Sequence, residues 1–153
     1  MLDLINSLGS TIDSQLILAM AFLGLSTAVM AFGVPWVLPV LSFSSGMLLG
    51  GRVGVAVILA GSLIGSQLLF VVARRWMAGP IRRRWDHRLK RYDREISKRG
   101  FFYLVGLRLF GAPQLLVSTA CALSPLPART FALATLIGLT PAIVIAVTAG
   151  SVI

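Results

Sequence analysis

The sequence has few of the residues on which enzymes and soluble domains depend. Of its 153 residues, 12% are charged, five are acidic, one is histidine and one is cysteine. A single cysteine, Cys121, excludes a disulfide within the chain. No Ser-His, Cys-His, paired-carboxylate or metal-ligand set occurs in the apolar segments, because all the acids lie outside them, at Asp3, Asp13, Asp86, Asp93 and Glu95. We therefore expect neither an enzyme nor a bound metal or cofactor.

Apolar residues are abundant: they make up 57% of the chain, and the mean hydropathy is +0.90. Uncharged runs cover Ser14–Gly51, Val53–Ala73, Leu109–Ala128 and Thr130–Ile153. About 20 helical residues cross the hydrocarbon core of a bilayer. The sequence therefore predicts an all-α integral membrane protein with three or four crossings and no separate soluble domain.

Positive charge is concentrated in one segment, since 11 of the 14 Lys and Arg residues lie between Arg74 and Arg99. The positive-inside rule predicts that this segment is cytoplasmic, and it explains the basic composition without nucleic acid. Within residues 80–99, apolar side chains recur every three or four positions, which favours an amphipathic helix lying on an anionic leaflet. A solvated linker helix explains the same pattern equally well.

Proline and serine interrupt two of the apolar segments. In residues 35–51, Pro35 and Pro39 precede a small, polar stretch that includes Ser44, Ser45 and Gly46. Two half-helices of about eight residues would each rise about 12 Å, which predicts a re-entrant hairpin with its tip at Ser42–Gly46. We expect the same plan in residues 101–127, where the breakers are Pro113, Pro125 and Pro127.

The two halves of the chain show a weak repeat. A shift of 77 residues places Arg52 on Arg129 and Gly61 on Gly138. An odd number of crossings between the units would invert the second relative to the first, as in many transporters. The predicted order is an interfacial helix (1–13), a transmembrane helix (14–34), a hairpin (35–51), a transmembrane helix (52–76), the basic segment (77–100), a second hairpin (101–127) and a transmembrane helix (128–153).

Three stretches resemble, in order and spacing, the VTT-domain superfamily of DedA and SNARE-associated Golgi proteins. They are "VPWVLPVLSFSSGMLLGGRVG", "AGSLIGSQLLFVVARRW" and "GLRLFGAPQLLVSTACALSPLPARTFALATLIGLTPAIVIAVTAG". The resemblance implies opposed re-entrant hairpins and movement of lipids between leaflets, with undecaprenyl phosphate carried by many bacterial members and phospholipid by eukaryotic relatives. It also implies the plasma membrane of a bacterium.

The chain departs from the pattern of this superfamily in several places. Gly111 stands where the superfamily often has proline, and Gln114 where the DedA branch tends to have a second arginine. The first hairpin lacks the acidic residues typical of that branch, so a proton relay through buried carboxylates has no obvious residues here. The sequence also ends, at Ile153, before the additional C-terminal span that the pattern of many relatives would lead us to expect.

Arg108 is a permanent cation within an apolar segment. Facing lipid, it would cost several kcal/mol, so we expect it to face a wet cavity or a partner. A guanidinium binds phosphate oxygens bidentately, which suits a lipid phosphate. A structural role, through hydrogen bonds to backbone carbonyls or through snorkelling, remains open. Snorkelling is also the favoured role of Arg52 and Arg129.

We therefore predict a protein that translocates a phosphate-bearing lipid between leaflets. The alternatives are a small-anion or solute transporter that uses the same cavity, and a non-transporting assembly or scaffold subunit. Whether the chain forms a homo-oligomer is left open. The candidate substrate-binding residues are Arg108, Pro113, Gln114, Pro35, Pro39, Ser44, Ser45, Gly46, Thr119, Arg52 and Arg129.

Overall fold

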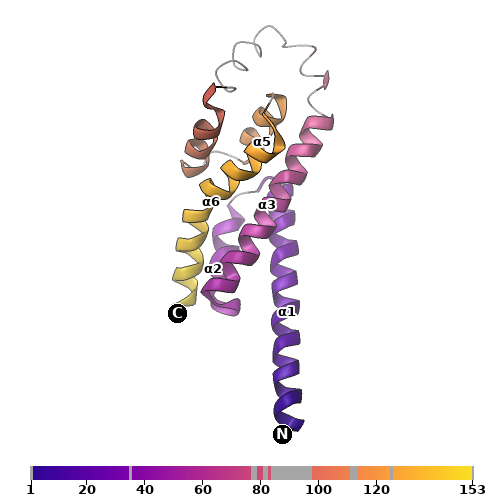
Figure 1. Ribbon diagram of the computed structural model, residues 1–153, viewed down its shortest axis with the longest axis vertical. Helices are drawn as coiled ribbons and strands as arrows, with labels where there is room; N and C mark the ends of the chain where they lie inside the picture. Colours follow the sequence, from indigo (N-terminus) through magenta and orange to yellow (C-terminus); the bar gives the residue numbers. More distant parts are fainter. Residues whose placement is uncertain are drawn as a thin grey trace.

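Helices account for nearly all of the chain that can be described, and no strand occurs in that part. The computed structural model describes residues 2–34, 36–76, 79–80, 83, 98–110, 114–124 and 126–152. The helices, shown in Figure 1, are α1 (Leu2–Ala31), α2 (Val37–Leu49), α3 (Gly51–Trp76), α5 (Gln114–Leu123) and α6 (Ala128–Ser151). A further helical segment, residues 98–109, precedes α5.

Three of these helices are long and apolar enough to cross a membrane: Ser7–Ala31 of α1, all of α3 and all of α6. Large apolar side chains also cover their outward faces, as at Ile17, Leu68 and Ile145. Such a surface is unfavourable in water and favourable against lipid tails. The predicted all-helical, multi-pass membrane protein is therefore confirmed.

The helices α3 and α6 run antiparallel through the centre of the bundle. Near one end, the rings of Phe70 and Phe131 stack with centroids 4.6 Å apart. Towards the other end, a Cβ atom added at Gly54 would lie 3.1 Å from Cγ1 of Val147. The remaining helices pack around this pair.

Glycines of α3 allow α1 to approach closely. A Cβ atom added at Gly61 would lie 2.8 Å from the carbonyl oxygen of Leu23, and one at Gly65 would lie 2.7 Å from Cβ of Met30. Thr27 Oγ1 also donates a hydrogen bond of 3.2 Å to the carbonyl of Gly61. The small-xxx-small spacing in α3 thus serves helix packing.

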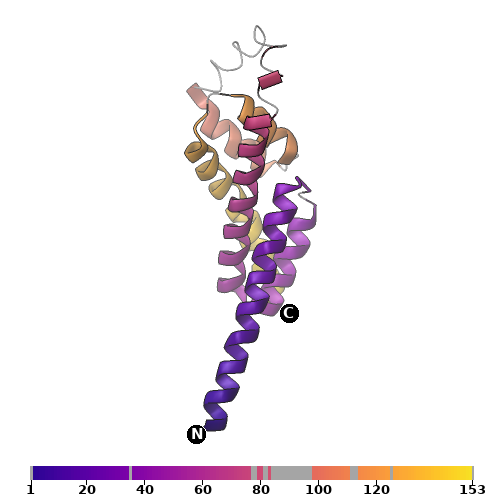
Figure 2. The ribbon, with the colours of Figure 1, turned by 90° about the vertical axis from the view of Figure 1, so that its right-hand side faces the viewer.

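In each half of the chain, a turn near the middle of the bundle precedes a helix that runs its full length. The helix α1 ends beside the middle of α3, α2 returns to the end where α3 begins, and α3 then runs the length of the bundle (Figure 1). From the opposite end, residues 98–109 descend to the middle and α5 returns, before α6 runs the full length. The first half of α1 projects beyond the other helices (Figure 2).

The expected hairpin tip at Ser42–Gly46 is wrong, because α2 is one continuous helix from Val37 to Leu49. Pro39 is tolerated because it lies in the first turn of the helix, where the backbone N–H has no helical partner. The buried hydroxyl of Ser42 bonds the carbonyl of Leu38 within the helix, at 2.8 Å. The chain turns earlier, after α1, where Gly33 adopts a positive φ of 71°.

The expected separate interfacial helix over residues 1–13 is not formed either, since α1 is continuous from Leu2 to Ala31. Residues 10–23 contain no glycine or proline that would end a helix there. Most of the basic segment, residues 77–100, lies outside the described residues.

Candidate anion site at Arg108

Arg108 lies near the end of the helical segment 98–109, beside the middle of α6, and its side chain is only 8% exposed. Its Nη2 atom donates a hydrogen bond of 3.0 Å to Oγ1 of Thr135. Thr135 in turn donates its hydroxyl hydrogen to the carbonyl of Phe131, at 2.7 Å. Because that hydrogen is used within α6, the hydroxyl oxygen is oriented to accept from the guanidinium.

Gly138 makes room for the arginine stem on α6. A Cβ atom added there would lie 2.6 Å from Cβ of Arg108. From this point the side chain extends along α6 towards its N-terminus, so that the guanidinium carbon lies 5.3 Å from the ring centroid of Phe131. The charge is thus displaced from the middle of the bundle towards the end that carries the basic segment.

A second arginine lies on the other side of the same aromatic pair. Phe70 stacks on Phe131, and the guanidinium carbon of Arg74 lies 5.0 Å from the centroid of Phe70. Nη2 of Arg74 also donates a hydrogen bond of 2.9 Å to the carbonyl of Ser124, just after α5. Two guanidiniums therefore flank one stacked pair of phenylalanines, and each makes a cation–π contact.

A similar glycine contact in the first half of the bundle involves no charged side chain. There Met30 of α1 packs against Gly65 of α3, as Arg108 packs against Gly138. Each of these glycines has a hydroxyl residue three positions earlier in the chain: Ser62 precedes Gly65, and Thr135 precedes Gly138. The hydroxyl of Ser62 is buried and has no hydrogen-bond partner among the described residues. Only the second half therefore has a cation at this place.

The predicted site residues of the second half of α2 lie away from Arg108, beside the C-terminal part of α6. The hydroxyls of Ser44 and Ser45 bond carbonyls within α2, at 2.9 and 2.8 Å. Gly46 packs against the backbone of Val147, close to the C-terminal end of α6. Thr119 is half-buried in the middle of α5.

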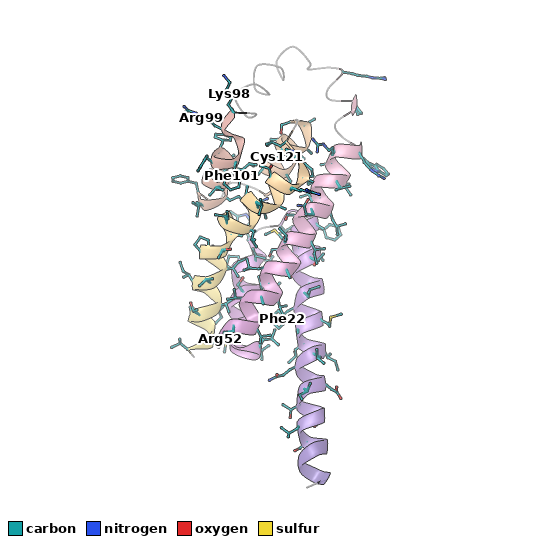
Figure 3. The ribbon with its side chains drawn as sticks, viewed as in Figure 1. Phe22, Arg52, Lys98, Arg99, Phe101 and Cys121 are labelled. Atoms are coloured by element: carbon teal, nitrogen blue, oxygen red, sulfur yellow. The ribbon has the colours of Figure 1, made fainter. Side chains whose placement is uncertain are left out.

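Three further candidates are exposed and two lie outside the described residues. Pro39 is exposed near the start of α2. Arg129 is exposed at the start of α6, and Arg52 is exposed at the end of the bundle opposite Lys98 and Arg99 (Figure 3). Pro35 and Pro113 lie outside the described residues. Gln114 begins α5, and its side chain lies outside the description.

Sequence reasoning missed Thr135 and the arginine–phenylalanine stack. Arg74 was assigned to the charged segment, although it is preceded four residues earlier by Phe70, the helical spacing for a side-chain contact. Thr135 precedes Gly138 by about one helical turn. A polar and a small residue on one face of a helix indicate a place where a polar side chain from another helix can pack. Among the described residues, no three His, Cys, Asp or Glu side chains lie close enough together to hold a metal ion.

The fold and the buried cation define a multi-pass helical membrane protein with a charged group held inside an apolar bundle. A family model of the VTT domain matches residues 16–152. The chain belongs to the VTT-domain family. It is also 29% identical over 144 residues to the Transmembrane protein 41 homolog of Dictyostelium discoideum. That alignment covers 92% of this chain and 43% of the relative, so the chain spans less than half the relative's length. No solved structure matches the chain.

Proposed function

We propose that this protein moves a phosphate-bearing lipid, such as a phospholipid or undecaprenyl phosphate, between membrane leaflets, with Arg108 binding the phosphate. The observation that carries the proposal is a guanidinium buried against Thr135 and Phe131 inside a bundle whose outer faces are apolar. A permanent charge held at this depth in an apolar bundle costs free energy, which marks the residue as functional. An anion that reaches the guanidinium lowers that cost.

Phosphate is the anion that fits this group best. A guanidinium presents N–H donors in a planar fork that matches two phosphate oxygens, and its charge persists when water is excluded. Thr135 accepts a hydrogen bond from Nη2, which helps to orient the fork. A lipid supplies phosphate with acyl or prenyl chains that stay in the surrounding hydrocarbon while the head group moves.

The opposed turns support a route for the head group. We propose that α1 with α2, and residues 98–109 with α5, form two re-entrant hairpins of an inverted repeat, which enter from opposite leaflets and approach each other at mid-bundle. Large aromatic side chains flank these turns and are strongly exposed: Phe32 is 80%, Trp36 85% and Phe110 92% exposed. The bilayer would be thinnest beside such turns, with the basic segment on the cytoplasmic side.

The test is leaflet exchange of a head-group-labelled phospholipid in proteoliposomes, normalised to correctly inserted protein. Arg108→Gln removes one charge-assisted contact, worth about 1.5–3 kcal/mol, so we expect exchange to slow about 10- to 150-fold. Arg108→Lys keeps the charge without the fork and should give an intermediate rate. Arg75→Gln is the control, since Arg75 is exposed on α3 and its loss changes the net charge equally.

Three results would contradict the proposal. Undiminished exchange in Arg108→Gln would remove this residue from the mechanism. Parallel loss of thermal stability and exchange in both Arg108 variants would indicate a structural arginine. No exchange in the unmodified protein, with phospholipid or with polyprenyl phosphate, would favour a solute transporter or a scaffold.

A further inference from the structure

We infer that Arg74 is a second phosphate-binding residue, which receives the lipid head group from the leaflet at the basic end before it reaches Arg108. This inference rests on the proposed function and extends it to a residue on a different helix. It starts from the contrast between two adjacent arginines at the end of α3.

Arg75 behaves as expected of an arginine near the end of a membrane helix, since it is exposed. Arg74 is directed inward: it is half-buried, lies 5.0 Å from the ring centroid of Phe70 and donates to the carbonyl of Ser124. A snorkelling arginine extends to the head-group region instead. Arg74 is thus held where a head group would leave the interface and enter the bundle.

The contacts of Arg74 orient its guanidinium but use only part of its hydrogen-bond donors. Its one hydrogen bond to a described residue uses Nη2, whereas a guanidinium carries five N–H groups. Among the described residues, no carboxylate lies within salt-bridge distance of Arg74. The guanidinium carbon lies 5.0 Å from the centroid of Phe70, and the N–H groups that do not bond Ser124 are the ones that would bind a phosphate.

The two arginines lie close enough to act in sequence. The contacts from Arg74 through Phe70 and Phe131 to Arg108 leave the two guanidinium carbons within roughly 15 Å of each other. Two cations in a poorly screened region repel each other, and an anion beside either one relieves that repulsion. Arg108 therefore offers a second site of the same chemistry to a phosphate that leaves Arg74.

The other half of the bundle offers no such sequence of sites. Met30 packs against Gly65 as Arg108 packs against Gly138, and the polar groups buried on α1 and α3 include the hydroxyls of Ser26, Ser62 and Ser66. Neutral hydroxyls bind phosphate less strongly than guanidiniums do. Among the described residues, the two arginines directed into the bundle therefore lie towards the basic end, and Arg74 is the one closer to that end.

The decisive variants are Arg74→Gln and the control Arg75→Gln, both in the full chain. A glutamine at position 74 keeps a polar amide on a shorter side chain but removes the charge. In the exchange assay we expect Arg74→Gln to lower the phospholipid rate about 10-fold, the effect of losing one charge-assisted contact. Arg74→Lys should fall between the two, and Arg75→Gln should match the unmodified protein.

A binding measurement separates phosphate recognition from a structural role. In detergent, the melting temperature is recorded against the concentration of a short-chain phosphatidylglycerol, which stabilises the folded state as it binds. We expect Arg74→Gln to raise the half-saturating concentration about 10-fold. If Arg74 only caps α5, the melting temperature without lipid falls and the half-saturating concentration does not change, which would overturn the inference.

Two further outcomes distinguish a failure of this inference from a failure of the proposed function. If Arg108→Gln abolishes exchange while Arg74→Gln leaves both exchange and binding unchanged, the proposed function stands and this inference is wrong. Labelled inorganic phosphate is supplied to the same vesicles in a parallel experiment. Uptake of phosphate that depends on Arg74, without lipid exchange, would assign the site to free phosphate and overturn both the lipid step and the proposed function.

Discussion

Replacement of Gly46 by alanine should destabilise the bundle, although alanine is the better helix former. A Cβ atom at this position would overlap the carbonyl oxygen of Val147 and lie 2.9 Å from its carbonyl carbon. Both atoms belong to the backbone of α6, so no side-chain rotation can relieve the overlap, and α2 must move away from α6. Overpacking of this kind costs about 1–3 kcal/mol, with backbone contacts at the upper end. The gain in helix propensity is about 1 kcal/mol, which leaves a net loss of about 2 kcal/mol.

The assay is thermal unfolding of the purified protein in detergent. A net loss of about 2 kcal/mol corresponds to a melting temperature lower by about 4–8 °C for a chain of this size. Gly24→Ala is the matched control, because nothing lies within 4 Å of a Cβ atom there and only the propensity gain applies. It should raise the melting temperature by about 2–4 °C. A Gly46→Ala protein as stable as Gly24→Ala would refute the close backbone contact between α2 and α6.

Two further predictions concern the site and the topology. Thr135→Val removes the oxygen that accepts from Arg108 and should lower the free energy of unfolding by about 1.5–3 kcal/mol. The control is Thr148→Val, which should change stability little because that hydroxyl is exposed and bonded within its own helix. Equal effects of the two substitutions would contradict the buried contact. Single cysteines at Arg99 and Ser151, in a cysteine-free background, should react with impermeant reagents from opposite membrane faces, and labelling of both from one face would contradict an odd number of crossings between them.

Hydropathy predicted the long helices because an uncharged run of sufficient length has few alternatives in a membrane. The structure has α3 and α6 close to the expected ranges, and α1 merges two expected elements. The position of the first turn was predicted wrongly. Serines between Leu41 and Gly46 suggest irregular backbone from the sequence, but in the structure their hydroxyls bond carbonyls of the preceding turn of the helix.

Arg108 was singled out from the sequence because a charge in an apolar segment is costly whatever surrounds it. Its partner Thr135 lies 27 positions away along the chain. Only the packing of residues 98–109 against Gly138 of α6 decides which turn of α6 the guanidinium reaches. The stack of Phe70 on Phe131 likewise depends on the register between α3 and α6, which hydropathy does not specify.

The close approach of α2 and α6 has a mechanical consequence. Gly46 faces the backbone of Val147, and Gly150 faces the backbone of Phe43, so two carbonyl groups touch the opposite helix with no side chain between them. No side-chain rotation can loosen such a joint. It lies at the end of the bundle away from Arg74. If the bundle widens while this joint stays intact, the helices separate least at the joint. They separate most at the opposite end, towards which both arginines lie.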